Sequence, residues 1–345
     1  MATEISDGEL GERLAGRTLE LIDIPSESRD EAPIAAHVTG VLRAAGAPVR
    51  DLGDTCVLAG RGAPILLAGH FDTVPAQGNR PGRRDGDRVH GLGASDMKGA
   101  VAVMIELALA GAPVDCLFFG REELPVAESA LTPLLAREPL GPELVVMMEP
   151  TDNAIHAGCL GNINATWTFA GTAGHSARPW DADNAIHKAA RAIAALAVHE
   201  PDEHEFGGLR FFEVASVTRI AGGIAMNVIP DRVEAHVNFR YAPGRSAEDA
   251  EARLVELCGG EGELLVTSNA PSGPVPVGNP HLRRLRERLP VEPKQAWTPV
   301  AEFGLAGLDA INFGPGEPAK AHRRDESVRV EALVRAYRLL EAFAA

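Results

Sequence analysis

Carboxylate and histidine side chains come directly after apolar runs at several points of the sequence. His70 and Asp72 follow "PILLAG" (64–69), while Glu122 and Glu123 follow "VDCLFFG" (114–120). Glu149 follows "ELVVMM" (143–148), and His322 comes a few residues after "LDAINFG" (308–314). Imidazole nitrogens and carboxylate oxygens are common zinc ligands in hydrolytic enzymes. These residue types at these positions therefore predict a metal site.

The apolar runs are expected to bring these side chains together. Short apolar runs bounded by turns are typical of strands buried on both faces of a mostly parallel sheet. In open α/β sheets, ligands bind beyond the carboxyl ends of the strands. Asp96 adds a further carboxylate, just before a helix expected over residues 97–110. We therefore expect one edge of one sheet to carry the whole set.

Five carboxylates at one edge would repel one another unless cations were bound there. They are Asp72, Asp96, Glu122, Glu123 and Glu149. Like charges a few ångströms apart raise the pKa of some members of such a group. Two divalent cations would neutralise three ligating carboxylates and one bridging hydroxide. Mixed histidine and carboxylate ligands suit zinc, and two ions about 3.5–4 Å apart are the usual hydrolytic arrangement.

Each of these residues also has a simpler interpretation. A single histidine or glutamate after a strand is usually a solvated loop residue, and Asp96 can be the N-terminal cap of the helix that follows it. His90 and His156 also follow apolar stretches, and we interpret them as ordinary residues. The joint pattern at four strand ends is what favours a metal site.

The rest of the chain predicts a mostly parallel α/β domain interrupted by an inserted α+β domain. Helices are expected over residues 7–23 and 31–45 of the first part. The middle predicts strands over 162–171, 209–220, 231–241 and 262–267 and helices over 183–199 and 246–258. That βαββαβ order is the ferredoxin-like pattern. We therefore expect residues 1–159 and 271–345 to form the catalytic domain and residues 160–270 to form the insertion.

Composition restricts the classes of partner. The chain has 345 residues, 45% of them hydrophobic, and a formal net charge of −15. That charge argues against a nucleic-acid or anionic-membrane partner, and no apolar run reaches the roughly 18 residues of a membrane span. Four scattered cysteines without a CxxC pair, and an acidic N-terminal segment unlike a secretory signal, favour a cytoplasmic location.

The order of the motifs resembles the di-zinc aminoacylase/carboxypeptidase family over almost the whole chain. The matching segments are "GHFDTVP" (69–75), "GLGASDMKGA" (91–100), "GREE" (120–123), "MEPT" (148–151), "GHSARP" (174–179), "NVIPD" (227–231), "NFRYAP" (238–243) and "NFGPGEPAKAHRRDE" (312–326). Each motif alone is weakly specific, whereas together they are strong. The resemblance implies that Asp96 bridges two metal ions. It implies that His70 and Glu149 complete one metal site, and that Glu123 and His322 complete the other.

The same resemblance implies the roles that surround the metals. Asp72 would orient His70, and Glu122 would be the general base and proton shuttle for the attacking water. His175 would stabilise the oxyanion from the inserted domain of a partner subunit. Arg121, beside the glutamate pair, is interpreted as a solvated charge.

Arg178, Arg240 and Asn227 are the residues that the resemblance implies for substrate binding. Arginine holds carboxylates through two parallel hydrogen bonds, so the two arginines suit a small anionic N-acyl amino acid. Without the family, surface salt bridging is the simpler interpretation of both. The inserted domain's edge strands would form a homodimer, as in the family.

The branch most similar in its motifs is that of the succinyl-diaminopimelate desuccinylases. It implies removal of the succinyl group from N-succinyl-LL-2,6-diaminopimelate in lysine and diaminopimelate biosynthesis, with two Zn²⁺ ions and Co²⁺ as a possible substitute. Acetylornithine deacetylases and di- or carboxypeptidases of the same family are the alternatives, followed by a metal-binding scaffold without catalysis. Two departures from the family pattern bear on the substrate. Pro299 and Glu302 stand in the late motif where Asp and Arg are common, and Leu124 follows the glutamate pair where many relatives have Gly.

Overall fold

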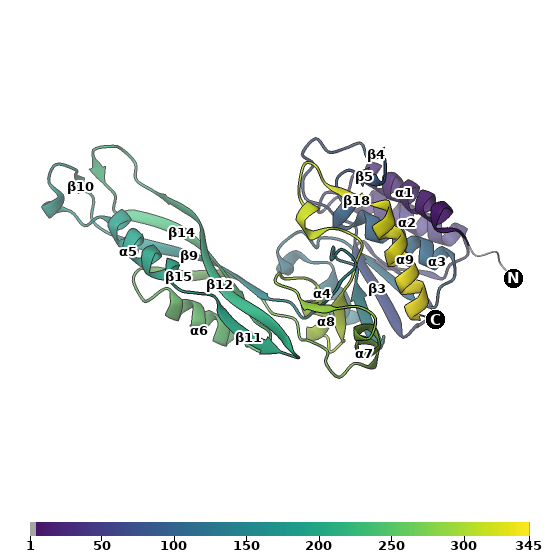
Figure 1. The fold of residues 1–345 in the computed structure, drawn as a ribbon. Helices are drawn as coiled ribbons and strands as arrows, with labels where there is room; N and C mark the ends of the chain where they lie inside the picture. Colours follow the sequence, from purple (N-terminus) through teal and green to yellow (C-terminus); the bar gives the residue numbers. More distant parts are fainter. Residues whose placement is uncertain (1–4, 345) are drawn as a thin grey trace. The chain divides into compact units, whose positions relative to one another are not determined.

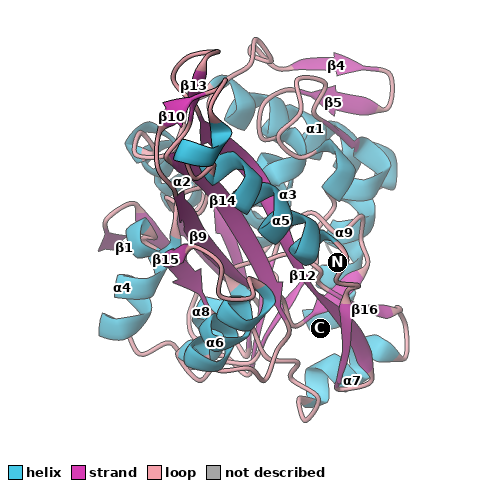
Figure 2. Ribbon diagram, turned by 90° about the vertical axis from the view of Figure 1, so that its left-hand side faces the viewer, coloured by secondary structure: helices cyan, strands magenta, loops and turns pink. Residues whose placement is uncertain are grey.

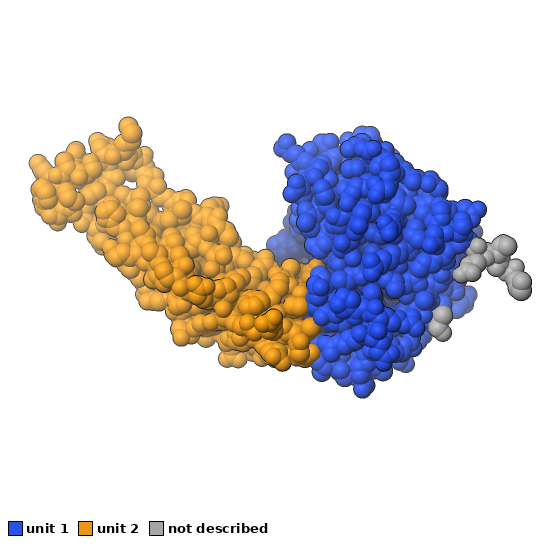
Figure 3. All heavy atoms as spheres, viewed as in Figure 1, with its two compact units in different colours: residues 1–158, 275–292, 298–345 blue, residues 159–274, 293–297 orange. Residues whose placement is uncertain are grey.

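The computed structural model describes residues 5–344, which form two compact units. Unit 1 consists of residues 1–158, 275–292 and 298–345, and unit 2 consists of residues 159–274 and 293–297 (Figure 3). No helix among residues 5–344 is long and apolar enough to cross a membrane.

Unit 1 is built on a mixed sheet whose centre is parallel (Figure 1). The strands run in the order β1-β2-β6-β3-β7-β17-β8-β16. Their bounds are Val49–Gly53, Cys56–Ala59, Asp115–Phe119, Ile65–His70, Leu144–Met147, Ala310–Asn312, Ile155–Ala157 and Val291–Pro293. Neighbours among β6, β3, β7 and β17 pair in parallel. All residues of β3, β6 and β7 are buried, which explains their unbroken apolar runs.

Helices cover this sheet. They are α1 (Asp7–Asp23), α2 (Ala32–Ala44), α3 (Gly99–Leu109), α4 (Leu131–Arg137), α7 (Pro280–Arg286), α8 (Val300–Leu305) and α9 (Val330–Ala344). Helix α3 contacts α1, α2 and α9 as well as β3 and β6, and it is apolar on nearly every side because it is enclosed. A small sheet adds β4 (Arg83–Asp85), β5 (Arg88–His90) and β18 (Ser327–Arg329).

Unit 2 holds an antiparallel sheet in the order β11-β12-β14-β9-β15, with two helices (Figure 2). The strands are Asp202–Phe206, Leu209–Gly222, Arg232–Tyr241, Gly161–Ala170 and Glu263–Ala270, and the helices are α5 (Ala185–Ala197) and α6 (Ala247–Leu257). Buried residues alternate along β9 and β14 and pack with α5 and α6 in one core. The expected βαββαβ order is confirmed, with β11 added beside β12.

A second, two-stranded sheet belongs to unit 2. It pairs β10 (Gly174–His175) with β13 (Val228–Ile229) in antiparallel fashion. The 3-10 turn Pro179–Asp181 follows β10. Asn184 caps α5 by accepting hydrogen bonds from two amides at the start of that helix. This small sheet carries His175.

Candidate metal centre

Parallel pairing places the ends of three strands of unit 1 at one edge of the sheet. His70, the last residue of β3, is in register with Phe119, the last of β6. Ala68 of β3 is in register with Met147, the last residue of β7. The segments that carry Glu122, Glu123 and Glu149 therefore leave the sheet beside His70.

The histidines and carboxylates of this edge converge. His70 Nε2 lies 3.3 Å from Asp96 Oδ1, 3.8 Å from Glu149 Oε1 and 3.9 Å from Glu122 Oε2. His322 Nε2 lies 3.0 Å from Glu123 Oε1 and 3.4 Å from Asp96 Oδ2. Asp96 thus turns one oxygen towards each histidine.

The donor set fits a pair of divalent cations. Two groups of potential ligand atoms lie within 4.8 Å of one another: His70 with Glu122 and Glu149, and His70 with Asp96 and Glu123. Nitrogen and carboxylate donors of this kind suit zinc and related transition metals. Asp96 faces both groups of donors and could serve two ions at once.

Burial and the neighbouring charges shift the pKa values of the groups at this edge. Burial and the nearby Glu149 raise the pKa of Glu122 well above its usual range. Burial also raises the pKa of Glu123. Hydrogen bonds to Asp96 and Glu123 raise the pKa of His322 to about 11. Binding of a metal ion at this position would require the neutral ring of His322.

Burial opposes charge on His70 and Asp96 as well, but hydrogen bonds outweigh it. Contacts with Asp72 and Asp96 raise the pKa of His70 well above its ordinary value despite burial. Contacts with His322 and His70 lower the pKa of Asp96 despite burial. Asp96 is therefore held as an anion, which suits a residue placed between two cation positions.

Asp72 holds the backbone of the glutamate pair. Its Oδ1 accepts the amide N–H of Glu122 at 3.0 Å, and its Oδ2 accepts that of Glu123 at 3.0 Å and the hydroxyl of Ser28 at 2.7 Å. His70 Nδ1 lies 3.0 Å from the backbone carbonyl of Asp72 and 3.5 Å from its carboxylate. The contact to the glutamate amides was not predicted from the sequence.

Arg121 is fixed rather than solvated, so the interpretation as a solvated charge is wrong. Its backbone N–H donates to Glu31 Oε1 at 3.0 Å, and its Nη1 donates to Asp54 Oδ1 at 2.8 Å. Its Nε donates to the carbonyl of Glu128 at 2.8 Å. The φ angle of Arg121 is 59°, in the left-handed region that non-glycine residues rarely adopt. These bonds hold the turn that presents the glutamate pair.

Glu31 escaped the sequence reasoning. It directly precedes helix α2 and stands two residues before Pro33, and acidic residues are common at helix N-termini. Nothing in the local sequence indicates that the carboxylate of Glu31 is buried and accepts the distant amide N–H of Arg121.

Asp96 does not cap the following helix, so that simpler interpretation is wrong. Helix α3 begins at Gly99, and its N-cap residue is Lys98. Asp96 has φ −130° and ψ 93°, outside the helical region. The non-helical backbone at this residue directs its carboxylate to the two histidines instead.

Glu302, one of the two departures from the family pattern, is an internal residue. Its side chain is buried and accepts hydrogen bonds from the hydroxyls of Ser129, at 2.9 Å, and Thr132. Burial raises its pKa. The carboxylate joins α8 to α4 and to the residues just before α4.

The candidate residues of unit 2 do not all converge. His175, Arg178 and Asn227 lie together around the small sheet, because the backbone of Arg178 bonds to that of His175 and the backbone of Ser176 bonds to that of Asn227. Arg240 is the last residue but one of β14, and the eight steps from Arg232 at the start of this strand span about 26 Å at 3.3 Å per residue. Within unit 2, Arg240 therefore forms a separate position.

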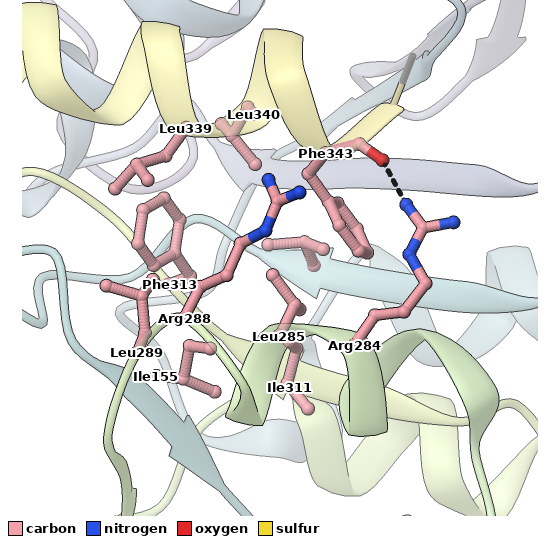
Figure 4. A pocket seen from close by; sticks show the side chains of 11 residues that line it. Ile155, Arg284, Leu285, Arg288, Leu289, Ile311, Phe313, Leu339, Leu340 and Phe343 are labelled. Atoms are coloured by element: carbon pink, nitrogen blue, oxygen red, sulfur yellow. Dashed lines mark hydrogen bonds between the residues drawn. The ribbon is translucent and has the colours of Figure 1, made fainter.

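A separate apolar pocket of unit 1 contains none of these residues. It lies between α7, α9 and the sheet (Figure 4). The residues drawn include Arg284, whose Nη2 donates to the carbonyl of Phe343 at 2.8 Å. The lining lacks any carboxylate or histidine, so the metal-ligand chemistry belongs to the strand ends.

Curated relatives match nearly the whole chain. A Mycobacterium tuberculosis protein assigned as succinyl-diaminopimelate desuccinylase DapE is 38% identical over 340 residues, which cover 94% of this chain and 96% of that one. The succinyl-diaminopimelate desuccinylase of Corynebacterium glutamicum is 32% identical and covers 94% of each chain. The N-acetyl-L-citrulline deacetylase of Xanthomonas campestris is 32% identical and covers 83% of this chain and 84% of that one.

Solved structures show the same fold. Aminopeptidase PepT from Bacillus cereus superposes with a TM-score of 0.76 at 20% identity, covering 96% of this chain and 97% of that one. The YXEP protein of Bacillus subtilis, a dinuclear metal binding peptidase from the M20 family, gives a TM-score of 0.70 at 16% identity and covers 98% of each chain. The protein-family model described as a peptidase dimerisation domain matches residues 158–263 of this chain. The resemblance inferred from the motifs is confirmed: the chain belongs to the M20 family, whose members are metallopeptidases and related amide hydrolases.

Proposed function

We propose that this chain is a dinuclear zinc amidohydrolase that removes the succinyl group from N-succinyl-LL-2,6-diaminopimelate. The observation that carries the hydrolytic part is Asp96, whose two oxygens face His70 at 3.3 Å and His322 at 3.4 Å. The substrate follows from two relatives assigned as succinyl-diaminopimelate desuccinylases, which match 94% of this chain at 38% and 32% identity.

Five residues would hold the ions. Asp96 would be shared by them, His70 and Glu149 would complete one site, and Glu123 and His322 would complete the other. Bound zinc, or cobalt in its place, would polarise the substrate carbonyl and lower the pKa of the attacking water. The close approach of these side chains at the end of the parallel strands supports the assignment.

Glu122 is the residue that takes and returns the proton in this proposal. Its carboxylate is 3.9 Å from His70 Nε2, beside the ligand atoms. Asp72 holds its amide, so the side chain starts from a fixed backbone. Its pKa is raised by burial and by Glu149, which favours a carboxyl group able to carry the proton to the leaving amine.

His175 would donate a hydrogen bond to the oxyanion. Its Nδ1 accepts the amide N–H of Ala177 at 3.0 Å. The neutral ring therefore carries its proton on Nε2, which can donate. His175 is exposed in its own chain, so it is free to serve the site of a partner subunit.

We propose a homodimer formed through β12. Strand β11 pairs with Leu209–Glu213 of β12, and β14 pairs with Val214–Gly222 on the other side. Among the described residues the later half of β12 thus pairs only with β14. An edge of this kind is a template for another strand, and Ile220 on it is 53% exposed.

The substrate residues follow the same proposal. Arg178, Asn227 and Arg240 would bind the carboxylates of a small N-acyl amino acid, and the two arginines offset the net charge of −15 that would repel it. Because Arg240 lies apart from the other two in unit 2, we propose that one substrate does not contact all three from a single subunit. The cytoplasmic location stays a prediction.

An N-acetyl amino acid is the second candidate substrate, favoured by the relative named N-acetyl-L-citrulline deacetylase. A panel of succinylated, acetylated and dipeptide substrates tests both, with protein stripped by a chelator and reloaded with Zn²⁺. We expect turnover of N-succinyl-diaminopimelate that is lost on chelation and restored by zinc. A preference for an acetylated substrate would show that an N-acetyl amino acid, and not N-succinyl-diaminopimelate, is the substrate. A zinc-loaded protein inert towards the whole panel would support the scaffold alternative.

A further inference from the structure

Glu326 binds the loop that carries Asp96 through its own side chain. Its Oε1 accepts the amide N–H groups of Ser95 and Asp96, each at 3.0 Å, and its Oε2 accepts that of Gly93 at 3.0 Å. The carbonyl of the same residue accepts the amide of Gly91 at 3.1 Å. One residue therefore receives four backbone hydrogen bonds from a six-residue segment that lies more than two hundred positions earlier in the sequence.

These bonds are strong and well enclosed. The side chain of Glu326 is 2% exposed and Ser95 is 1% exposed, so water competes weakly for the amides. A charged acceptor makes shorter and stronger hydrogen bonds than a neutral one. The loop has little other regular structure, since Asp96 and Met97 leave the helical region. The carboxylate of Glu326 therefore accepts backbone amides that a helix or strand would otherwise bond to carbonyl groups.

Glu326 belongs to the same chain segment as His322, the candidate ligand of the second cation. Glu326 follows His322 by four residues, and its amide N–H donates to the carbonyl of Arg323 in the turn between them. That turn is also held by Gln77, whose Nε2 donates to the carbonyl of His322 at 3.1 Å. The segment with His322 and the loop with Asp96 are thus joined by Glu326.

We propose that Glu326 is a positioning residue for the metal pair, which sets Asp96 between His70 and His322 by binding the backbone of the Asp96 loop. This inference rests on the dinuclear centre of the proposed function. Because the oxygens of Asp96 face both histidines, a displaced loop changes both cation positions together. A residue that only stabilised the fold would leave metal affinity unchanged in the folded protein.

Glu326→Gln tests the proposal while keeping the volume of the side chain. Glutamine retains one acceptor oxygen and places an NH₂ group against amide donors, so at least one of the three bonds is lost. Asp325→Asn is the matched control, because Asp325 is the neighbouring carboxylate and its partners are the side chains of Lys320 and Arg323. Both variants are prepared as full-length protein, stripped with a chelator and shown to melt cooperatively.

The readout is Co²⁺ binding, followed by visible absorption at pH 8. We expect Glu326→Gln to weaken binding of both ions by about 10–100-fold, the usual effect of losing an outer-shell partner. Asp325→Asn should stay within about twofold, because it removes no contact to the Asp96 loop.

Three outcomes decide between the proposals. Wild-type protein that binds no pair of ions would overturn the dinuclear centre and this inference with it. Wild-type binding together with unchanged affinity and spectrum in Glu326→Gln would overturn the inference alone. If Glu326→Gln does not fold, Glu326→Asp is used, which keeps the charge and withdraws it by one methylene. Failure of both variants to fold would show that the carboxylate serves the fold, contrary to the proposal.

Discussion

The carboxylate edge of unit 1 and the small β10–β13 sheet of unit 2 hold their candidate residues in opposite ways. At the carboxylate edge, His70 is 1% exposed and Asp72 is fully buried. At the small sheet His175 is exposed, and nearby Trp180 is 76% exposed. Most of the first group is enclosed by its own unit, although the side chain of His322 is 50% exposed, whereas the second group is exposed on its unit.

The hydrogen bonds differ as well. Around the carboxylate edge, buried acids that are distant in sequence accept amides of the loops that carry the site: Glu31 binds Arg121, Asp72 binds the glutamate pair, and Glu326 binds the Asp96 loop. Around His175 the bonds are backbone contacts, of which that of Ser176 to Asn227 also joins residues distant in sequence, and one ring contact to Ala177. A centre that must hold cations needs fixed ligands, while a residue that serves another subunit needs an accessible position.

Glu122→Gln is expected to give the largest effect and to separate proton transfer from metal binding at the carboxylate edge. Turnover should fall by about 10²–10⁴-fold, because the amide cannot take the proton. Metal content should stay at the wild-type value. Steady-state kinetics and metal analysis check this, with Glu128→Gln on the exposed side of the same segment as the control. Loss of an ion in Glu122→Gln would instead make Glu122 a ligand.

His175→Ala probes the other region. Loss of one oxyanion donor should slow turnover by about 10²–10³-fold, with both ions retained because His175 lies in unit 2. Mixing His175→Ala with Glu122→Ala chains should restore part of the activity, since one site of the heterodimer has both residues. His187→Ala, exposed on α5, is the control. Proven heterodimers without any recovery would contradict supply of His175 by the partner.

Asp72→Asn sharpens the role of buried acceptors at the carboxylate edge. Its NH₂ group would face the amide of Glu122 or Glu123, so the turn that carries the pair should shift. We expect metal affinity to fall by about 10–100-fold, measured by competition with a chelator. Asp85→Asn, whose side chain is 71% exposed, should leave affinity unchanged. Equal affinities in the two variants would show that the turn does not depend on Asp72.

The smallest expected change in the free energy of unfolding is at Trp180 of unit 2, and Trp167 of the same unit serves as the reference. Trp180→Ser should alter the free energy of unfolding by no more than about 0.5 kcal/mol, because the ring is exposed in its own chain. Trp167→Ala should cost about 3–5 kcal/mol, since this ring is 1% exposed in the core. Urea unfolding measures both. A large loss in Trp180→Ser would indicate that its ring is packed in the assembled protein.

The fold class was predictable because long periodic segments determine it. The helix expected over residues 7–23 matches α1 (Asp7–Asp23), and the apolar runs match β3, β6 and β7. The short strands β8 and β16 were not predicted, since three residues carry no readable period. Helix α9 was missed although Leu333, Tyr337 and Leu340 are spaced as on one helical face. Nothing in the sequence indicates that residues 293–297 belong to unit 2, between two segments of unit 1.

For the candidate site, residue types at strand ends could be recognised, but their supports could not. The ligand-type residues follow apolar runs, and parallel strands bring their carboxyl ends to one edge. Glu326 stands in the charged run "HRRDE", which has the composition of an exposed turn. Its partners are amides, which every residue possesses, so no side-chain pattern identifies them. The same reason hides the contact of Asp72 with the glutamate pair.

The ligand-type residues are spread along the chain in a way that affects biosynthesis. His70, Asp96, Glu123 and Glu149 precede unit 2, whereas His322 follows it, and β17 enters the sheet between β7 and β8 after unit 2 has been made. At about 5–20 residues per second, the ribosome needs roughly 10–35 s to pass from Glu149 to His322. The growing polypeptide therefore exposes an incomplete, strongly acidic half-site during that interval. In the proposed centre, the second cation position would be completed only after His322 has been made, near the end of translation.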